Sequence, residues 1–232
     1  MQVTTWNCKG LNGAVKHGNI FAHLKKLGTN IAFLQETHLK NRDHTLLRKN
    51  WVGQVFHSSF NSKSRGTAII IRKDVPFILD DIVPDMNGRY IIVTGKLYNI
   101  PVVLANIYAP NHDDEQFISS FLATLPKLET HKLILGGDFN LVLNPWLDRS
   151  SNKTQTLTKS AKVINTFIDT YRISDPWRFL YPNQRKYSFF SPVHHTYTRI
   201  DYFLIDCELL SVVRTVIMKQ WYYRITAPLF LN

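Results

Sequence analysis

Apolar residues recur along the chain at two spacings, one typical of strands and one typical of helices. Runs rich in β-branched and aromatic residues predict strands at Gln2–Cys8, Ile31–Gln35, Gln54–Ser58, Gly66–Arg72, Tyr90–Leu97, Val102–Tyr108, Lys132–Gly136, Tyr187–Ser191 and Arg199–Asp206. Helical spacing predicts helices at His17–Leu27, Gln116–Leu128 and Leu157–Tyr171, with Val163, Phe167 and Tyr171 on one face of the last. Because hairpin-like and helical connections both occur, we expect a mixed sheet arrangement.

Length and composition indicate one folded α/β domain over residues 1–232. Hydrophobic residues make up 44% of the chain and charged residues 19%, which is typical of globular proteins. No apolar run is long enough to span a membrane, and the amino terminus lacks the pattern of a signal peptide. We therefore expect an intracellular monomer, nuclear or cytoplasmic and not secreted. Cys8 and Cys207 lie in apolar, strand-like surroundings, which predicts two buried, reduced thiols.

The net charge of the chain indicates what kind of partner it binds. The chain has 28 Lys and Arg against 17 Asp and Glu, a formal net charge of +11. Such an excess favours polyanions, with nucleic acid ahead of anionic membrane surfaces. Charge of this kind predicts attraction and does not identify a reaction.

Polar residues follow or end several of the predicted strands, where side chains from distant sequence positions can converge. These residues are Asn7, Glu36, Tyr108, Asn111, Asp138, Asn140 and Asp201. Carboxylate and carboxamide oxygens suit a hard cation such as Mg²⁺. No Cys/His spacing fits zinc, and Gly136-Gly137 is too short for a Walker loop or a dinucleotide fingerprint.

Each of these residues also has a structural explanation as a turn former, a helix start or a strand exit. Asp138 and Asn140 are harder to explain in this way, because side chains at i and i+2 after two glycines point the same way. Asp201 lies inside an apolar strand, where an unpaired carboxylate is costly. A buried carboxylate therefore needs a partner or a role.

The ordered motifs WN, QET, NIYAPN, GGDFN, YSFFSP and RIDYFLI resemble the endonuclease/exonuclease/phosphatase superfamily. YSFFSPVHHTYTRIDYFLI is most similar to the apurinic/apyrimidinic-type endonuclease domain of LINE-type, non-LTR retrotransposons. The resemblance covers Gln2 to about Leu229. It implies a four-layered α/β sandwich of two mostly antiparallel sheets flanked by helices, as in deoxyribonuclease I. It also implies Mg²⁺- or Mn²⁺-dependent hydrolysis that nicks DNA, with a reverse-transcriptase domain of a longer polyprotein as a partner.

The resemblance assigns roles residue by residue. Glu36 would hold the cation with help from Asn7, and Asp138 would orient or deprotonate the attacking water. Asn140 would bind water and the scissile phosphate, and Tyr108 would donate to a phosphate oxygen. Asp201 matches an acidic position close to the site. Phosphate or DNA contacts would come from Asn111, Ser188, Lys9 and Arg199, and the basic residues expected to flank the site are Lys9, Arg65, Lys186 and Arg199. In several relatives an acidic residue stands at the place of Lys9.

The carboxy-terminal segment departs from the family pattern, in which Ser-Asp-His precedes a short apolar strand. The corresponding stretch here is Tyr223-Arg224-Ile225-Thr226-Ala227-Pro228-Leu229. In this register Ile225 and Thr226 replace the Asp and the His, and we expect both within reach of Asp138 and Tyr108. Loss of one transition-state donor costs about 10²–10³ in rate, so we expect low or no activity. Since the chain stops at Asn232, we also expect a short final strand.

Other functions stay open at this point. A catalytically inactive nucleic-acid-binding module is favoured by Ile225 and Thr226. A phosphatase of the same superfamily is disfavoured by the +11 charge and by the LINE-like segment. A preference for abasic sites is compatible with the resemblance.

Overall fold

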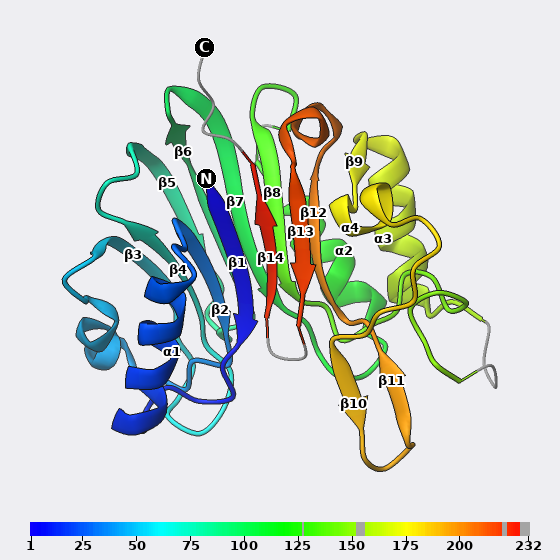
Figure 1. The fold of residues 1–232 in the computed structure, drawn as a ribbon, viewed down its shortest axis with the longest axis horizontal. Helices are drawn as coiled ribbons and strands as arrows, with labels where there is room; N and C mark the ends of the chain where they lie inside the picture. The colour runs from blue at the N-terminus through cyan, green and yellow to red at the C-terminus, as the bar shows by residue number, and fades with distance from the viewer. Residues whose placement is uncertain (127, 152–155, 220–221, 228–232) are drawn as a thin grey trace.

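The computed structural model describes residues 1–126, 128–151, 156–219 and 222–227. Two six-stranded sheets lie face to face, and a two-stranded hairpin projects from one end (Figure 1). The first sheet has the order β13-β14-β1-β2-β4-β3, with bounds Thr215–Met218, Tyr223–Thr226, Gln2–Asn7, Ile31–Gln35, Thr67–Arg72 and Val52–Ser58. The second has the order β5-β6-β7-β8-β12-β9, with bounds Phe77–Pro84, Tyr90–Leu97, Ile100–Tyr108, Lys132–Asp138, Asp201–Asp206 and Ile173–Ser174.

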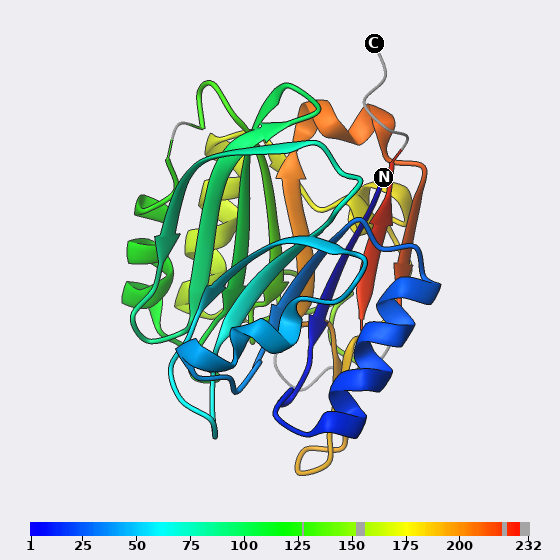
Figure 2. The same cartoon turned by 90° about the vertical axis from the view of Figure 1, so that its left-hand side faces the viewer.

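Helices cover the outer face of each sheet. Figure 2 shows α1 (Ala14–Lys26) on one side of the paired sheets and α2 (Glu115–Ala123) with α3 (Lys159–Thr170) on the other. Short helical elements complete the fold at α4 (Pro176–Leu180), η1 (Asn41–Leu47) and η2 (Cys207–Val212). Only the β1–β2 and β7–β8 pairs are parallel among the described strand pairs. The expected α/β sandwich of two mostly antiparallel sheets is therefore confirmed. No helix of the described ranges is long and apolar enough to cross a membrane.

The space between the sheets changes character along its length. Most of it is apolar, with alternate residues of each strand pointing inward, such as Ile69 of β4 and Leu104 of β7. Toward one end the layer becomes polar. There the buried Asn106 amide donates to the carbonyls of Leu34 and Ala68 in the opposite sheet, at 2.9 Å each, and its Oδ1 accepts from Gln35 Nε2. This polar layer fixes the distance between the two sheets next to the strand ends that carry the candidate residues.

Several elements differ from the expectations. The strands β5, β9, β11 (Thr196–Thr198), β13 and β14 were not predicted, because they are short or have mostly exposed side chains. The third helix ends at Thr170, and Tyr171 is 47% exposed rather than on the buried face. Cys8 is buried as expected, but Cys207 begins η2 and is only half-buried. The strand β10 (Phe189–Ser191) and β12 are both shorter than predicted, leaving Ser188, Arg199 and Ile200 in connecting segments.

Candidate active site

The strand register brings the candidate residues to the same end of the sandwich. Asn7 is the last residue of β1, and its parallel neighbour on β2 is Gln35, which precedes Glu36. In the second sheet Tyr108, Asp138 and Asp201 lie side by side on β7, β8 and β12. In Figure 1 this is the lower end, from which the β10–β11 hairpin projects, whereas the amino terminus lies at the opposite end. The predicted convergence of strand-end side chains is present in the structure.

Asn7 connects the two sheets. Its Nδ2 donates to Glu36 Oε1 and to Asp138 Oδ2, at 2.8 Å each. Its Oδ1 accepts from the backbone N–H of Lys9 at 3.1 Å. One carboxamide therefore orients two carboxylates that come from different sheets.

The glycines of GGDFN allow β8 to lie close to its neighbours. Gly137 has φ +150, and a Cβ there would lie 2.0 Å from the Ile107 carbonyl oxygen. After Asp138 the chain turns sharply, with Asn140 in the left-handed region at φ 51. The Asn140 N–H donates to Asp138 Oδ1 at 3.0 Å, and its Nδ2 donates to the Ala109 carbonyl at 2.9 Å. Asp138 lines a hollow beside α1, whereas Asn140 lines a second hollow beside the β10–β11 hairpin.

The acidic groups lack enough positive charge to balance them. Burial raises the pKa of Asp138, and Asp201 and Glu36 raise it further against the hydrogen bonds from Asn7 and Asn140. Burial also raises the pKa of Asp201 to about 6, although the Ser188 hydroxyl and Lys9 act in the opposite direction. A buried carboxylate whose pKa is raised by neighbouring carboxylates, as that of Asp138 is, would be stabilised by a bound cation.

Tyr108 completes the group. Burial raises the pKa of its hydroxyl, and so do the charges of Glu36 and Asp138 and a hydrogen bond to Glu36. Tyr108 therefore stays protonated and can donate a hydrogen bond. Arg89, which nothing in the sequence singled out, lies over the Tyr108 ring at 5.0 Å and donates to the Ala109 carbonyl at 3.3 Å.

A comparison with protein families identifies the family to which a chain with this site belongs. The model of the Endonuclease/Exonuclease/phosphatase family matches residues 4–215. The chain belongs to this family. The matched region contains the described candidate residues from Asn7 to Asp201 and ends before β14.

Similar proteins include a transposon protein and several nucleases. The chain is 25% identical over 223 residues to the "Transposon TX1 uncharacterized 149 kDa protein" of Xenopus laevis, an alignment that covers 91% of this chain and 16% of that protein. The AP endonuclease LMAP from Leishmania major has a TM-score of 0.80 at 19% identity, covering 97% of this chain and 86% of its own. The Xenopus laevis APE2 catalytic domain has a TM-score of 0.79 at 17% identity, covering 98% and 91%. At these identities the solved structures establish the shared fold.

The donor set fits a cation of the kind that the family resemblance implies. No cluster of three or more His, Cys, Asp or Glu side chains in the described part of the chain is arranged around a common metal position. Glu36 and Asp138 instead supply carboxylate oxygens on either side of Asn7. Mg²⁺ is usually held by one or two carboxylates together with waters and substrate phosphates, rather than by a closed protein cage. The residues present therefore fit an open, oxygen-rich Mg²⁺ or Mn²⁺ site.

Arg199 is not available to DNA, which corrects the expectation from sequence. Its side chain is 1% exposed, and its guanidinium lies 2.8 Å from Asp148 Oδ1 and 2.6 Å from Asp175 Oδ2. Ser188 is also buried, and its hydroxyl bonds to Asp201 and accepts from the N–H groups of Ile200 and Asp201. Both side chains therefore support the segment that leads into β12 instead of facing solvent.

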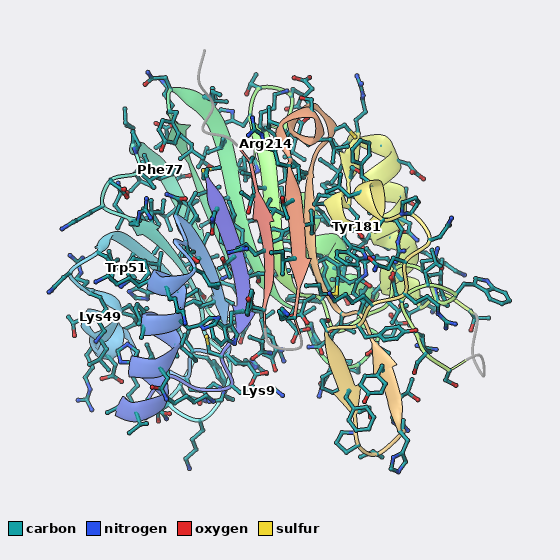
Figure 3. The ribbon with its side chains drawn as sticks, viewed as in Figure 1. Lys9, Lys49, Trp51, Phe77, Tyr181 and Arg214 are labelled. Atoms are coloured by element: carbon teal, nitrogen blue, oxygen red, sulfur yellow. The ribbon has the colours of Figure 1, made fainter. Side chains whose placement is uncertain are left out.

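The other expected DNA contacts fall into two groups. Lys9 and Asn111 are exposed next to the site, and Figure 3 shows Lys9 extending from the site end of the molecule. Arg65 and Lys186 are half-buried, and they lie 4.4 Å from the Phe60 ring and 5.6 Å from the Trp177 ring, respectively. Lys9 and Asn111 are thus the better placed pair.

Ile225 and Thr226 are not within reach of the site, contrary to the expectation. Their strand β14 runs antiparallel to β1, with Ile225 opposite Val3 and Thr226 opposite Gln2, at the far end from Asn7. At a rise of about 3.4 Å per residue, four residues along β1 separate Ile225 from Asn7 by more than 10 Å. Ile225 is 5% exposed and belongs to the apolar core between the sheets. Pro228 and Leu229, on which the register rested, lie outside the described residues.

The described residue Tyr222, just before β14, lies at the end of this strand that is nearer to the site. Tyr222 packs against the rings of Trp6 and His23, at centroid distances of 5.7 and 5.4 Å. Trp6 immediately precedes Asn7 on β1. Among the described residues, no histidine is hydrogen-bonded or ion-paired to Asp138 or Asp201. The described histidine that is paired with a candidate acid is His38, whose Nε2 lies 3.3 Å from Glu36 Oε2.

Proposed function

We propose that this chain is a single domain, the divalent-cation-dependent DNA endonuclease domain of a LINE-type retrotransposon, and that it acts in the nucleus or the cytoplasm. The observation that carries the proposal is the Asn7 carboxamide, whose Nδ2 bridges Glu36 and Asp138 beside Tyr108 and Asp201. The similarity to a transposon protein supports the retrotransposon context. A reverse-transcriptase domain elsewhere in a longer polyprotein would then use the nicked strand as a primer.

In this proposal Glu36 would hold Mg²⁺ or Mn²⁺ and Asn7 would help to position it by orienting the carboxylates. The bound cation would neutralise charge on the scissile phosphate. Asp138 accepts the proton of the attacking water, consistent with a carboxylate whose pKa is raised by burial and by its acidic neighbours. Tyr108 donates its hydroxyl proton in a hydrogen bond to a non-bridging phosphate oxygen, which strengthens as charge builds in the transition state. The Asn140 Nδ2 donates to Ala109, and its Oδ1 would accept a hydrogen bond from the water. Asp201, on the adjoining strand, adds negative charge that raises the pKa of Asp138.

Two hollows beside the site suit the flanking nucleotides of a DNA strand. One has a volume of about 730 Å³ and runs from Asn7 and Asp138 to α1. The other has a volume of about 830 Å³ and lies between Asn140 and the β10–β11 hairpin. Phe189 and Ile200 contribute to both hollows and so form the wall between them. With Lys9 and Asn111 at the rim, the surface offers apolar walls to sugars and bases and polar groups to phosphates.

We further propose that hydrolysis is slow. The described residues place no histidine on Asp138 or Asp201, and loss of one transition-state donor typically lowers the rate by about 10²–10³. The same observation favours a second candidate function, a nucleic-acid-binding module without catalysis. Both candidate functions use the same DNA-binding surface, and they differ only in whether the site hydrolyses the bound DNA.

A plasmid-nicking assay separates these candidates. Supercoiled plasmid is incubated with the chain and Mg²⁺ or Mn²⁺, and in parallel with Glu36→Ala and with Asp80→Ala. Asp80 is an exposed acid on the edge strand β5, so its variant is a matched control for loss of one carboxylate. Slow conversion to the nicked form that disappears in Glu36→Ala and with a chelator supports the endonuclease. Tight DNA binding without nicking at any protein concentration supports the binding module.

A further inference from the structure

The backbone at Glu36 has an unusual shape. Glu36 and His38 both have positive φ, at 50 and 53, with Thr37 between them. A non-glycine residue in this region is strained and persists only when its surroundings impose it. Here the surroundings are backbone hydrogen bonds on both sides: Gly10 N–H to Glu36 O at 2.7 Å, Leu11 N–H to Thr37 O at 2.8 Å, Thr37 N–H to Gly66 O at 3.0 Å and His38 N–H to Arg65 O at 2.9 Å.

The consequence of this shape is that Glu36 and His38 meet. His38 Nε2 lies 3.3 Å from Glu36 Oε2, and the two side chains are 17% and 21% exposed. Gly10 leaves room for the imidazole, because a Cβ at that position would come within 3.0 Å of His38 Nδ1. The other carboxylate oxygen of Glu36, Oε1, accepts from Asn7. Glu36 is therefore held at both oxygens by groups from different parts of the chain.

We propose that His38 is a positioning residue for the cation site, with its Nε2–H holding Glu36 Oε2. This inference rests on the proposed function, in which Glu36 binds the cation. Carboxylates that bind metals are commonly hydrogen-bonded by a neighbouring group, and loss of that group typically weakens metal binding about 10- to 100-fold. A carboxylate fixed at both oxygens presents its remaining lone pairs in one direction. Without His38 the Glu36 side chain rotates away from that orientation and loses affinity for the cation.

Mn²⁺ alone is the probe that tests this role, because its binding is measured without any turnover. Electron paramagnetic resonance gives the dissociation constant for Mn²⁺ with the unmodified chain, His38→Ala, His38→Gln and His112→Ala. Gln retains an N–H donor near the position of Nε2, and His112, 72% exposed, is the matched control. We expect binding about 10-fold weaker or more in His38→Ala, and close to the unmodified value in His38→Gln and His112→Ala. Thermal unfolding of each variant separates loss of positioning from loss of the fold.

Three results would overturn the inference. His38→Ala could bind Mn²⁺ as tightly as the unmodified chain, or His38→Gln could bind as weakly as His38→Ala. Pulsed measurements could also detect coupling of Mn²⁺ to an imidazole nitrogen that disappears in His38→Ala, which would make His38 a direct ligand. A Glu36→Ala variant separates this failure from that of the proposed function. If Glu36→Ala leaves binding unchanged, the proposed cation site and this inference both fall; if it abolishes binding while His38→Ala does not, only the inference falls.

Discussion

Arg199 and Asp201 are two residues apart and belong to two very different groups of buried charge. Arg199 has carboxylates on two sides, Asp148 and Asp175, and its guanidinium also lies 4.4 Å from the Tyr202 ring. Asp201 lies beside Asp138, another carboxylate, in the adjoining strand. The first group is balanced within the protein, with Arg178 as a second cation on Asp148, whereas no described ion pair balances the second. The completeness of the partners, and not burial itself, separates a structural charge from a candidate catalytic one.

The pKa directions express the same difference. Burial alone would lower the pKa of Arg199, but Asp175, Tyr202 and Asp148 raise it above its ordinary value, so the guanidinium stays charged. For Asp201, burial raises the pKa to about 6 and its neighbours do not restore the ordinary value. The folded protein therefore stabilises the charge of Arg199 and destabilises the charge of Asp201. Sites that carry such uncompensated groups are candidates for function.

Removing Arg199 gives the largest expected effect. Arg199→Met leaves Asp175 without its ion-pair partner and Asp148 with Arg178 alone. Breaking a buried pair in this way costs about 3–5 kcal/mol. Urea unfolding followed by circular dichroism measures the loss of free energy. Arg214, an exposed arginine just before β13, is the control, and Arg214→Met is expected to change stability by less than about 0.5 kcal/mol. A stable Arg199→Met variant with weakened DNA binding would restore Arg199 as a DNA contact.

A double substitution in the carboxy-terminal strand β14 is expected to lower stability by nearly as much. In the structure Ile225 lies in the core, so Ile225→Asp with Thr226→His should destabilise the fold by about 2–5 kcal/mol and give no gain in nicking. If Ile225 and Thr226 occupied the family's Asp and His places, the same double change would raise nicking in a stable protein. Thermal unfolding and plasmid nicking on one preparation distinguish the two. Thr226→His alone, on the half-buried neighbour, is the control for a change outside the core.

Much of the fold and the site could be predicted from the sequence for a physical reason. Asn7, Glu36, Tyr108 and Asp138 lie at the ends of strands with strong apolar patterns, and strand ends in one sheet meet at a common edge. The motif order then carried the family resemblance. His38 was missed although it stands two residues after Glu36, because its contact depends on the two left-handed residues in the turn.

The errors arose where a residue's role depends on partners far away in the sequence. Arg199 is adjacent to the site in sequence, but its partners Asp148 and Asp175 are 51 and 24 residues away. The register at Ile225 was taken from local similarity, whereas pairing with β1 and burial of alternate residues set it in the fold. Neither kind of information is present in a short motif.

The stacked side chains of His44 and His57 form a third group of titratable residues, and they differ from the first two because burial favours their uncharged form. The rings of His44 and His57 stack with centroids 3.3 Å apart. Burial, followed by His57, lowers the pKa of His44 to about 3, and burial lowers that of His57. With the folded pKa below the unfolded value of 6.5, full stability is present above pH 6.5 and is lost as the pH falls toward 3. At pH 5 the unfolded chain is protonated at His44 and the folded chain is not, which lowers the free energy of unfolding by about 2 kcal/mol.

The variant His44→Gln should remove that pH dependence. Its free energy of unfolding should fall less between pH 7 and pH 5 than that of the unmodified chain, by about 2 kcal/mol. Chemical denaturation at both pH values gives the difference, with the exposed His112→Gln as the control. An unchanged slope in His44→Gln would show that acid sensitivity arises elsewhere, with the carboxylates of the candidate site as the next group to examine.

The smallest effect concerns Lys9, the exposed cation beside the unbalanced carboxylates. Its Nζ lies 5.9 Å from the Phe189 ring at the edge of the hollow next to Asp138. If Lys9 neutralises one DNA phosphate, Lys9→Ala should make the plot of log affinity against log salt less steep by about 0.9, with a similar loss on all sequences. Fluorescence anisotropy with a labelled duplex and a chelator measures binding without cleavage. Lys162 is exposed on α3, over the outer face of the second sheet, and Lys162→Ala should leave the slope unchanged. If Lys9→Ala and Lys162→Ala gave the same salt dependence, the net charge would attract DNA without a defined binding face. The two hollows beside the site would then lose their assignment as the path of the DNA strand.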